Sequence, residues 1–378
     1  MHCSRYKSNS FKVECEEEGK MAKKAVYIAS TTEYAGKSIV IMALALIAKG
    51  LGKKVGYFKP IGTESSLKGK LLDEDTEIMK NLLKLEGDAR VYCPVILRKH
   101  MFLEDFSPRD SSKYINEILR AYEEASREKD IVLIEGASTL SSGAFLNCSA
   151  PQLAEKLDAE VLLVSKFKND HIVDEILQAW DYALRWNVQI SGVLINQVPK
   201  SMMNRTEHVI KPILEDNDIK VLGIIPEDRM LGALTVKEIH EAIGGNILAG
   251  KEGMDKLVET VLVGAMTPES AMRYFQKAKN ELVITGGDRT DIVFAALEAG
   301  ATAVILTGNL YPSIKIFPRA DELAVPLILV PYDTYTTLQI VQSIVGRIKP
   351  NDQKRIERAK RLIEENIEWK QILLNCQS

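Results

Sequence analysis

The 378-residue sequence has few cysteines, no long apolar run and no excess of charge of either sign. Its five cysteines are scattered without a C-x-x-C pair, which argues against a zinc site or a disulfide framework and indicates a reducing, cytoplasmic compartment. No apolar run reaches the length of a membrane span, so we expect no membrane partner. The formal net charge of −3 lacks the basic excess typical of proteins that bind nucleic acid, and we expect no such partner.

Residues 1–20 are polar and lack the apolar core of a signal peptide, and we expect a disordered extension. Beyond them, apolar runs of strand length alternate with helical segments, which predicts an α/β fold with a mainly parallel sheet covered on both faces. In the first half, the predicted strands cover residues 25–29, 53–58, 130–134, 160–164, 189–195 and 220–225. The predicted helices cover residues 74–85, 112–128, 172–186 and 204–214, and a long loop or lid is expected over 93–109.

The stretch 25–49 has the plan of a phosphate-binding loop: an apolar strand, a tight turn, Gly36-Lys37-Ser38, and a helix rich in alanine and leucine. At such a helix start, backbone N–H groups, the helix dipole and the lysine attract a phosphate, and the serine hydroxyl can ligate Mg²⁺. The usual spacing would need glycine where Thr31 stands, so the loop is a variant, and an ordinary strand–helix turn is the alternative. The residues that we predict to bind the nucleotide here are Thr32, Glu33, Tyr34, Ala35, Gly36, Lys37, Ser38 and Ile39. Glu33 has the same sign of charge as a phosphate and opposes binding unless a metal or lysine neutralises it.

Polar residues at or after other predicted strands are further candidates for the site, because ligands of open α/β sheets bind beyond the carboxyl ends of the strands. Lys59 precedes a proline and is predicted to be either a basic residue of the site or a solvated lysine. Glu135 can hold Mg²⁺ opposite Ser38, or it can form a structural ion pair. Asp75 lies in an acidic run and can equally cap a helix. Asn196 can read a base edge, or it can lie in an ordinary turn.

These segments, in this order, resemble the ATP-binding domain of the dethiobiotin synthetase-like family over about residues 24–231. The similarity lies in STTEYAGKS, FKPIGTE, IVLIEGAS, GVLINQV and LGIIPEDRML, and in the place of Asp75. The resemblance implies a P-loop NTPase-like fold that binds ATP and Mg²⁺. The roles that it implies are phosphate binding by Lys37, nucleotide binding by Asn196 and Pro226, and metal binding by Ser38, Asp75 and Glu135. It also makes Lys37, Lys59 and Lys168 the candidate catalytic residues near a transferred phosphate.

One departure from this family concerns its substrate. Ser138 and Thr139 stand where the synthetases have two glycines close to the substrate. Because the side chains at positions 138 and 139 would crowd the substrate, we do not expect dethiobiotin synthesis itself.

The second half contains a compact α/β unit with predicted strands over 282–284, 303–307 and 326–330, a helix over 291–299, and a connector over 246–249 and 254–266. It resembles the DRTGG domain, although Asp291-Ile292 follow Asp288-Arg289-Thr290 in place of two glycines. Asp288 can cap the helix, and Arg289 can pair with an acid. Alternatively, the backbone of residues 286–290 and Arg289 hold a small anionic effector.

The order of the two domains resembles the amino-terminal regulatory portion of long phosphate acetyltransferases, without the acetyltransferase domain that follows there. We therefore predict a nucleotide-binding domain over 21–235, a DRTGG-like domain with its connector over 236–349, and a C-terminal helix over 350–378. That helix packs either on a partner subunit or on its own core. The function predicted first is an ATP- and Mg²⁺-binding regulatory or sensor protein, which forms a homodimer or larger homo-oligomer. The alternatives are a ligase that activates a carboxylate or carbamate by phosphoryl transfer, and a scaffold whose loop no longer binds phosphate.

Overall fold

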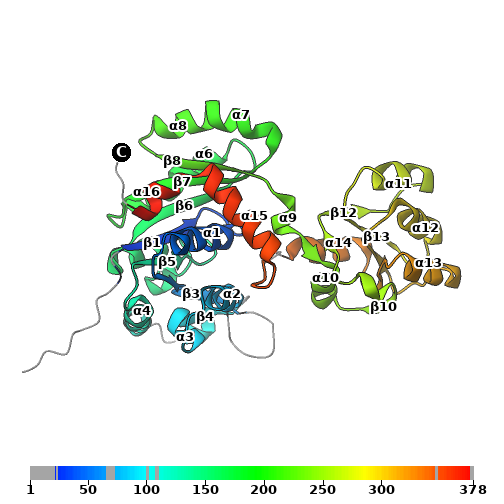
Figure 1. Cartoon of the computed structure of the whole chain (residues 1–378), viewed down its shortest axis with the longest axis horizontal. Helices are drawn as coiled ribbons and strands as arrows, with labels where there is room; N and C mark the ends of the chain where they lie inside the picture. The colour runs from blue at the N-terminus through cyan, green and yellow to red at the C-terminus, as the bar shows by residue number, and fades with distance from the viewer. Residues whose placement is uncertain are drawn as a thin grey trace, which may run out of the picture.

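The computed structural model describes residues 22, 24–64, 73–98, 102–106, 110–344 and 348–374, so the predicted extension over 1–20 lies outside the described residues. Two large sheets with their own helices, and two small sheets of two strands each, make up this part of the chain (Figure 1). The larger of the two large sheets belongs to the first half of the sequence and to the helices at its end. The other large sheet belongs to the segment between them.

The first sheet is parallel throughout its described part, with the strand order β2-β5-β1-β6-β7-β8. Its strands are β1 (Lys24–Ser30), β2 (Val55–Phe58), β5 (Ile131–Glu135), β6 (Glu160–Lys166), β7 (Ile190–Val198) and β8 (Val221–Pro226). The central strands are almost continuously apolar and buried, as expected for a parallel sheet that is covered on both faces. The predicted α/β class with a mainly parallel sheet is therefore confirmed.

Helices connect and cover these strands. They are α1 (Lys37–Gly50), α2 (Glu74–Leu83), α3 (Ala89–Tyr92), α4 (Ser111–Ser126), α5 (Ala150–Lys156), α6 (Ile172–Leu184), α7 (Met203–Arg205), α8 (Lys211–Glu215) and α9 (Arg229–Gly232). The helix predicted over 204–214 is one continuous run in which a π-helical stretch, Thr206–Ile210, joins α7 to α8. The loop predicted over 93–109 is only partly irregular, because Val95–Leu97 forms β4, which pairs with β3 (Ile61–Thr63).

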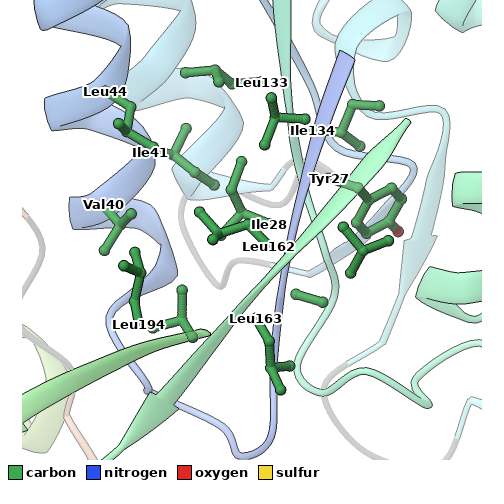
Figure 2. Packing of buried hydrophobic residues seen from close by; sticks show 14 of the residues in the cluster. Tyr27, Ile28, Val40, Ile41, Leu44, Leu133, Ile134, Leu162, Leu163 and Leu194 are labelled. Carbon is green, nitrogen blue, oxygen red and sulfur yellow. The ribbon is translucent and has the colours of Figure 1, made fainter. Parts of the chain in front are cut away.

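The core of the first unit forms where α1 packs on the sheet. Val40, Ile41 and Leu44 of α1 point toward Ile28 of β1 and Leu162 of β6 (Figure 2). All five side chains are almost fully removed from solvent. Burial of a side chain of this size contributes about 1.5–3 kcal/mol, so this contact fixes the start of α1 relative to the end of β1.

The second sheet has the strand order β10-β15-β14-β13-β12, with β10 antiparallel and the others parallel. Its strands are β10 (Asn246–Ala249), β12 (Thr260–Val263), β13 (Glu281–Gly286), β14 (Ala303–Thr307) and β15 (Leu327–Leu329), and its helices are α10 (Val236–Ile243), α11 (Pro268–Phe275), α12 (Thr290–Ala299), α13 (Phe317–Glu322) and α14 (Thr334–Ser343). Short strands β9 (Leu234–Thr235) and β11 (Leu257–Val258) pair beside it. The predicted connector over 246–249 and 254–266 was wrong, because these residues supply both edge strands of the sheet.

The end of the chain returns to the first unit. The single C-terminal helix predicted over 350–378 was wrong: α15 (Gln353–Asn366) and α16 (Trp369–Leu374) are separated by Ile367 and Glu368, of which Ile367 is extended. Ile367 forms an antiparallel bridge with Gly223 of β8, where an added Cβ would lie 2.6 Å from the Asn366 carbonyl oxygen. The apolar side chains of α15 and α16 join the core of the first unit, and α15 lies against α1 (Figure 1). Of the two predicted packing modes, the structure shows the helix on its own core.

Candidate functional site

The loop between β1 and α1 has the backbone shape of an anion-binding turn. Gly36, the residue before α1, has a φ of 88°, and Tyr34 has a φ of 55°. A positive φ is strained for a side chain such as that of tyrosine, so the surrounding structure must hold the loop in this shape. No side chain caps the first N–H groups of α1, which leaves the positive end of the helix open to an anion.

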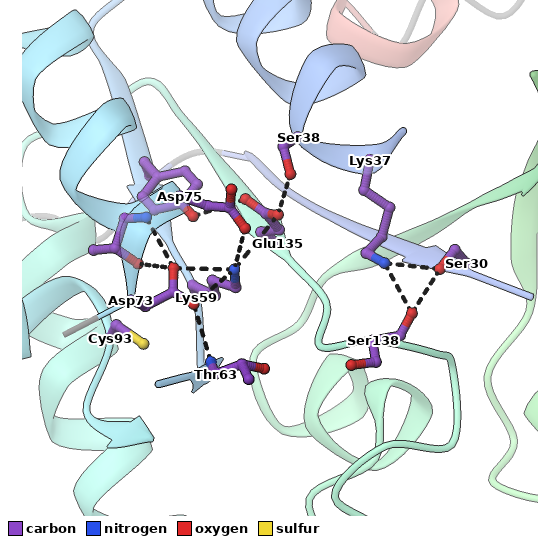
Figure 3. Close-up of polar contacts among 12 residues, drawn as sticks. Ser30, Lys37, Ser38, Lys59, Thr63, Asp73, Asp75, Cys93, Glu135 and Ser138 are labelled. Atoms are coloured by element: carbon purple, nitrogen blue, oxygen red, sulfur yellow. Dashed lines mark hydrogen bonds and ion pairs between the residues drawn. The ribbon is translucent and has the colours of Figure 1, made fainter. Parts of the chain in front are cut away.

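Lys37 lies at the start of α1 and its amine is buried. Nζ donates hydrogen bonds to Ser30 Oγ at 2.8 Å and to the Ser138 carbonyl oxygen at 3.0 Å (Figure 3). Among the described residues it has no acidic partner within ion-pair distance. Burial lowers the pKa of Lys37 to about 8, although Glu135 acts in the opposite direction. The site therefore contains a cation without a direct counter-ion, next to an open helix end.

Ser38 and Glu135 meet as the sequence predicts for a metal-binding pair. The Ser38 hydroxyl donates to Glu135 Oε1 at 2.8 Å, and the Tyr57 hydroxyl donates to Oε2 at 2.7 Å. Burial raises the pKa of Glu135, and Lys59 opposes that shift. Both oxygens of the carboxylate are thus held in fixed positions beside α1.

Lys59 lies in an acidic cluster and is not the solvated lysine that its sequence context allows. Its Nζ lies 3.0 Å from Asp73, 2.8 Å from Asp75 and 3.7 Å from Glu135 (Figure 3). Burial alone would lower the pKa of Lys59, but the three carboxylates hold it well above its ordinary value. One ammonium therefore balances part of the charge of three carboxylates.

Asp73, which the sequence analysis did not select, performs the capping role considered for Asp75. Asp73 caps α2 by accepting from the Thr76 N–H at 2.9 Å, and it also accepts from the Thr63 N–H at 3.0 Å. Asp75, the second residue of the helix, contacts Lys59. An acidic residue directly before a helical segment is a recognisable cap signal, so the sequence did contain the information about Asp73.

The donor set at this edge of the sheet fits Mg²⁺ when phosphate supplies the remaining ligands. Ser38, Asp75 and Glu135 offer the hard oxygen atoms that Mg²⁺ prefers, and Mg²⁺ commonly uses one or two carboxylates together with phosphate oxygens. Within the described residues, no group of three or more acidic, histidine or cysteine side chains is arranged to hold a metal without other ligands. The Lys59 amine already lies 2.8 Å from Asp75 and 3.7 Å from Glu135.

The remaining candidate residues lie in different surroundings. Asn196 is buried and donates to the Ala35 carbonyl oxygen at 2.7 Å, so it contacts the loop itself. Pro226 ends β8 and is half-buried. Lys168 is exposed, and no hydrogen bond or ion pair joins its side chain to another described residue.

Three features of the loop bear on whether it binds an anion. The Thr32 hydroxyl is buried without a hydrogen-bond partner among the described residues. Glu33 and Tyr34 are exposed, and among the described residues the Lys37 amine bonds Ser30 and Ser138 but neither of these two side chains. Ser30 lies where the related family has its first glycine and accepts from Lys37, a contact that the sequence pattern did not indicate.

The loop before α12 in the second unit is held by contacts within the chain. Arg289 pairs with Asp291 at 3.0 Å and donates to the Met266 carbonyl oxygen at 3.1 Å. This agrees with the structural role considered for Arg289. Asp288 does not cap the helix: the N-cap residue is Arg289, and no side chain supplies the cap bond.

Together, the parallel sheet and the loop between β1 and α1 define the class of P-loop NTPase-like α/β proteins. Within this class, the chain belongs to the family described as "AAA domain", whose family model matches residues 24–235. A second family model, described as "DRTGG domain", matches residues 238–344. The resemblance stated from the sequence is confirmed for both parts. No helix in the described ranges has both the length and the apolar character needed to cross a bilayer.

Some relatives match nearly the whole chain, and others match about half of it. The chain is 26% identical to a phosphate acetyltransferase of Synechocystis sp. over 363 residues, which cover 92% of this chain and 51% of that protein. It therefore spans about half the length of the phosphate acetyltransferases that it matches. It is 29% identical to an ATP-dependent dethiobiotin synthetase BioD of Caldicellulosiruptor saccharolyticus over 209 residues, 53% of this chain and 84% of that protein. A solved structure of the septum site-determining protein MinD of Pyrococcus horikoshii with Mg-ADP matches with a TM-score of 0.36 and 17% identity, covering 55% of this chain and 83% of that one.

Proposed function

We propose that this protein binds ATP with Mg²⁺ in its first unit and that the second unit responds to the bound nucleotide. The observation that carries the proposal is the buried Lys37 amine, which lacks a direct counter-ion and lies beside the uncapped start of α1. A buried cation is costly unless an anion compensates it, and a phosphate group meets this requirement. The unpartnered Thr32 hydroxyl offers a further hydrogen bond in the same loop.

In this proposal Mg²⁺ links the phosphates to the protein. Ser38, Asp75 and Glu135 would hold the ion; Ser38 and Glu135 are already in contact, and both carboxylates lie within 4 Å of the Lys59 amine. The bound ion would supply positive charge that offsets the phosphates. The candidate catalytic roles of Lys37, Lys59 and Lys168 stay predictions, as do the domain boundaries at 21–235, 236–349 and 350–378.

Thermal unfolding with and without nucleotide tests the proposal. ATP with Mg²⁺ at a hundred times its dissociation constant is expected to stabilise the folded protein by about 2.7 kcal/mol, because the ligand binds only the native state. Chelation of Mg²⁺ is expected to reduce the shift in Tm. A protein that shows no shift with any nucleotide, and no heat of binding in calorimetry, would contradict the proposal. Native mass spectrometry on the same sample tests the predicted homo-oligomer.

A ligase-type activity is the second candidate, because the match to the synthetase covers most of that relative. Lys59 bears on this candidate, since its ammonium is engaged by carboxylates and would have to leave them to contact a transferred group. ADP release that depends on an added metabolite, and that is lost when Lys37 is replaced, would favour the ligase over the sensor.

Three contacts lie beside the places where the chain passes between the two units: two hold α15 to residues of the first unit, and the third joins Lys349 to α10 of the second. Arg358 of α15 pairs with Asp228, Arg355 donates to the Leu231 carbonyl oxygen at 2.7 Å, and Lys349 lies 2.9 Å from Glu238. We call these three contacts the junction clamp. Glu238 also forms the capping box of α10, so the clamp ends on the first helix of the second unit.

We propose that a weak electrostatic interaction joins the junction clamp to α2. The hydrogen bond to Glu238 raises the pKa of Lys349, and Glu74 in the first turn of α2 acts in the same direction. Glu74 lies between Asp73 and Asp75, which hold Lys59. A shift of α2 on nucleotide binding would therefore change the field at Lys349 and at the start of α10.

Lys349→Glu is expected to uncouple the two units. In the wild-type protein, ATP should change the amide hydrogen exchange of α10; in the variant, like charges at positions 349, 238 and 74 should abolish that response. ATP affinity should stay within about twofold, because the ion pair of Lys349 among the described residues is with Glu238 and not with a residue of the candidate site. Lys237→Glu is the matched control, since Lys237 is exposed on α10 outside the clamp. If ATP changes the hydrogen exchange of α10 equally in Lys349→Glu and in the wild type, or does not change it in the wild type, the proposed coupling between the two units is contradicted.

A further inference from the structure

Tyr57 on β2 is a buried tyrosine whose hydroxyl contacts one of the candidate metal ligands. Its side chain is 0% exposed and belongs to the core of the first unit. The hydroxyl donates to Glu135 Oε2 at 2.7 Å. A buried phenol O–H needs a hydrogen-bond partner, and here that partner is a carboxylate. Phenylalanine would fill the same space in the core, so packing alone does not explain the hydroxyl group.

The pairing of β2 with β5 brings Tyr57 and Glu135 together. The two strands are parallel, and Tyr57 lies opposite Leu133. Because side chains alternate between the two faces of a strand, Leu133 and Glu135 point to the same face, and Tyr57 points to that face as well. Glu135 lies two residues beyond Leu133, a distance of about 6.6 Å along the strand. The long side chain of tyrosine spans this distance, so its hydroxyl reaches the end of β5.

The other oxygen of Glu135 faces the start of α1. The Ser38 hydroxyl donates to Oε1 at 2.8 Å, and the Lys59 amine lies 3.7 Å from the same atom (Figure 3). The last torsion of a glutamate side chain is broad and about twofold, so a donor to one oxygen leaves the carboxylate able to turn. Donors to both oxygens, one from α1 and one from β2, hold its plane in one orientation. Among the described residues, the hydrogen bond to Oε2 comes from Tyr57.

We propose that Tyr57 is a positioning residue, which holds the Glu135 carboxylate in the orientation that binds the Mg²⁺ accompanying the nucleotide. This inference rests on the proposed function, in which Ser38, Asp75 and Glu135 hold the ion. Mg²⁺ requires nearly ideal octahedral geometry, and residues that orient its ligands commonly change metal affinity by about 10–100-fold. The Tyr57 hydroxyl bonds Glu135 and not the loop between β1 and α1, so its loss should act on the metal and not on the phosphates directly.

Calorimetric titration of ATP with excess Mg²⁺ and with EDTA tests this role in Tyr57→Phe. The variant keeps the ring and should fold. It should bind ATP with Mg²⁺ about tenfold more weakly than the wild type, whereas its affinity for ATP in EDTA should stay within about twofold. Tyr122→Phe is the matched control and should keep both affinities, because Tyr122 is a buried tyrosine that packs on Phe58, with ring centroids 5.4 Å apart. Equal losses with Mg²⁺ and with EDTA, or no loss with Mg²⁺, would overturn the proposal.

Crystal structures of the ligand-free proteins test positioning without nucleotide. In Tyr57→Phe the Glu135 carboxylate should turn or occupy two conformers, and in Tyr122→Phe it should keep the wild-type orientation. A single, unchanged orientation in Tyr57→Phe would overturn the positioning role even if the wild-type protein bound no nucleotide. A wild-type protein that does not bind ATP, or whose ATP affinity Mg²⁺ does not raise, would contradict the proposed function instead. The two failures are therefore distinguishable.

Discussion

Lys37→Met is expected to abolish the ATP-induced rise in Tm and to remove a pH dependence of stability that the wild-type protein shows without ligand. The first effect follows from loss of the amine that we propose to pair with the phosphates. Without the amine, the start of α1 alone attracts the anion, and the dipole contributes only about 0.3–1 kcal/mol at an exposed helix end. The measurement is thermal unfolding with an ATP series for both proteins.

The pH dependence follows from the pKa of Lys37. Burial lowers it from 10.5 to about 8 in the folded protein, so between these two values the unfolded chain binds more protons than the folded one. Stability therefore rises with pH across this window, by an amount on the order of 3 kcal/mol for a shift of this size. Lys37→Met should lack this rise.

Lys49→Met provides the control for both measurements on Lys37. Lys49 lies on the same helix as Lys37 and is exposed. The control should keep both the ATP response and the rise of stability with pH. An ATP shift of wild-type size in Lys37→Met, or a stability profile that does not change with the substitution, would contradict the assignment of Lys37.

Lys59→Met is expected to destabilise the protein by about 3–5 kcal/mol at pH 7, because three carboxylates lose the cation that holds them together. Asp73, Asp75 and Glu135 all lie within 4 Å of the Lys59 amine, and Glu135 is buried. Without the ammonium, burial and the neighbouring aspartates raise the pKa of Glu135 further. Protonation then favours the folded state, so the deficit of the variant should shrink as pH falls from 7 toward 5.

Urea unfolding at pH 7 and pH 5 measures this deficit. Lys54→Met, an exposed residue directly before β2, serves as the control and should change the free energy of unfolding by less than about 0.5 kcal/mol at both pH values. A deficit for Lys59→Met below about 1 kcal/mol, or one that grows as pH falls, would show that the acidic cluster does not depend on Lys59.

The regular parts of the fold were predictable because their patterns are local. Strands β1, β5 and β6 are nearly continuous apolar runs, and α4 and α6 show helical spacing, so all five were found close to their observed bounds. The connector prediction missed β12, although its residues, Thr-Val-Leu-Val, form an apolar, β-branched run that is typical of a strand. The break between α15 and α16 was not visible, since Ile367 leaves the helix to pair with Gly223, far away in sequence.

In the candidate site, too, local patterns predicted some features, and contacts between distant residues set the others. The order strand, Gly36-Lys37-Ser38, helix, together with Glu135 after a buried strand, predicted the pair of residues that meet at 2.8 Å. The role of Asp73 was open to prediction as a helix cap, but its contact with Lys59 was not. The contact of Lys37 with Ser138 was not predictable, because it joins residues that are distant in the chain.

Residue order alone was sufficient for the α/β class, for the place of the phosphate loop and for the two-part organisation, since each depends on short-range periodicity and on motifs of adjacent residues. Folding in three dimensions determined which charges neutralise one another. It placed Lys59 among three carboxylates, left Lys37 without a direct counter-ion, and turned Asn196 and Gln197 toward the loop. Such contacts join side chains from different strands and helices, and their distances are set by how those elements pack, which no local pattern specifies.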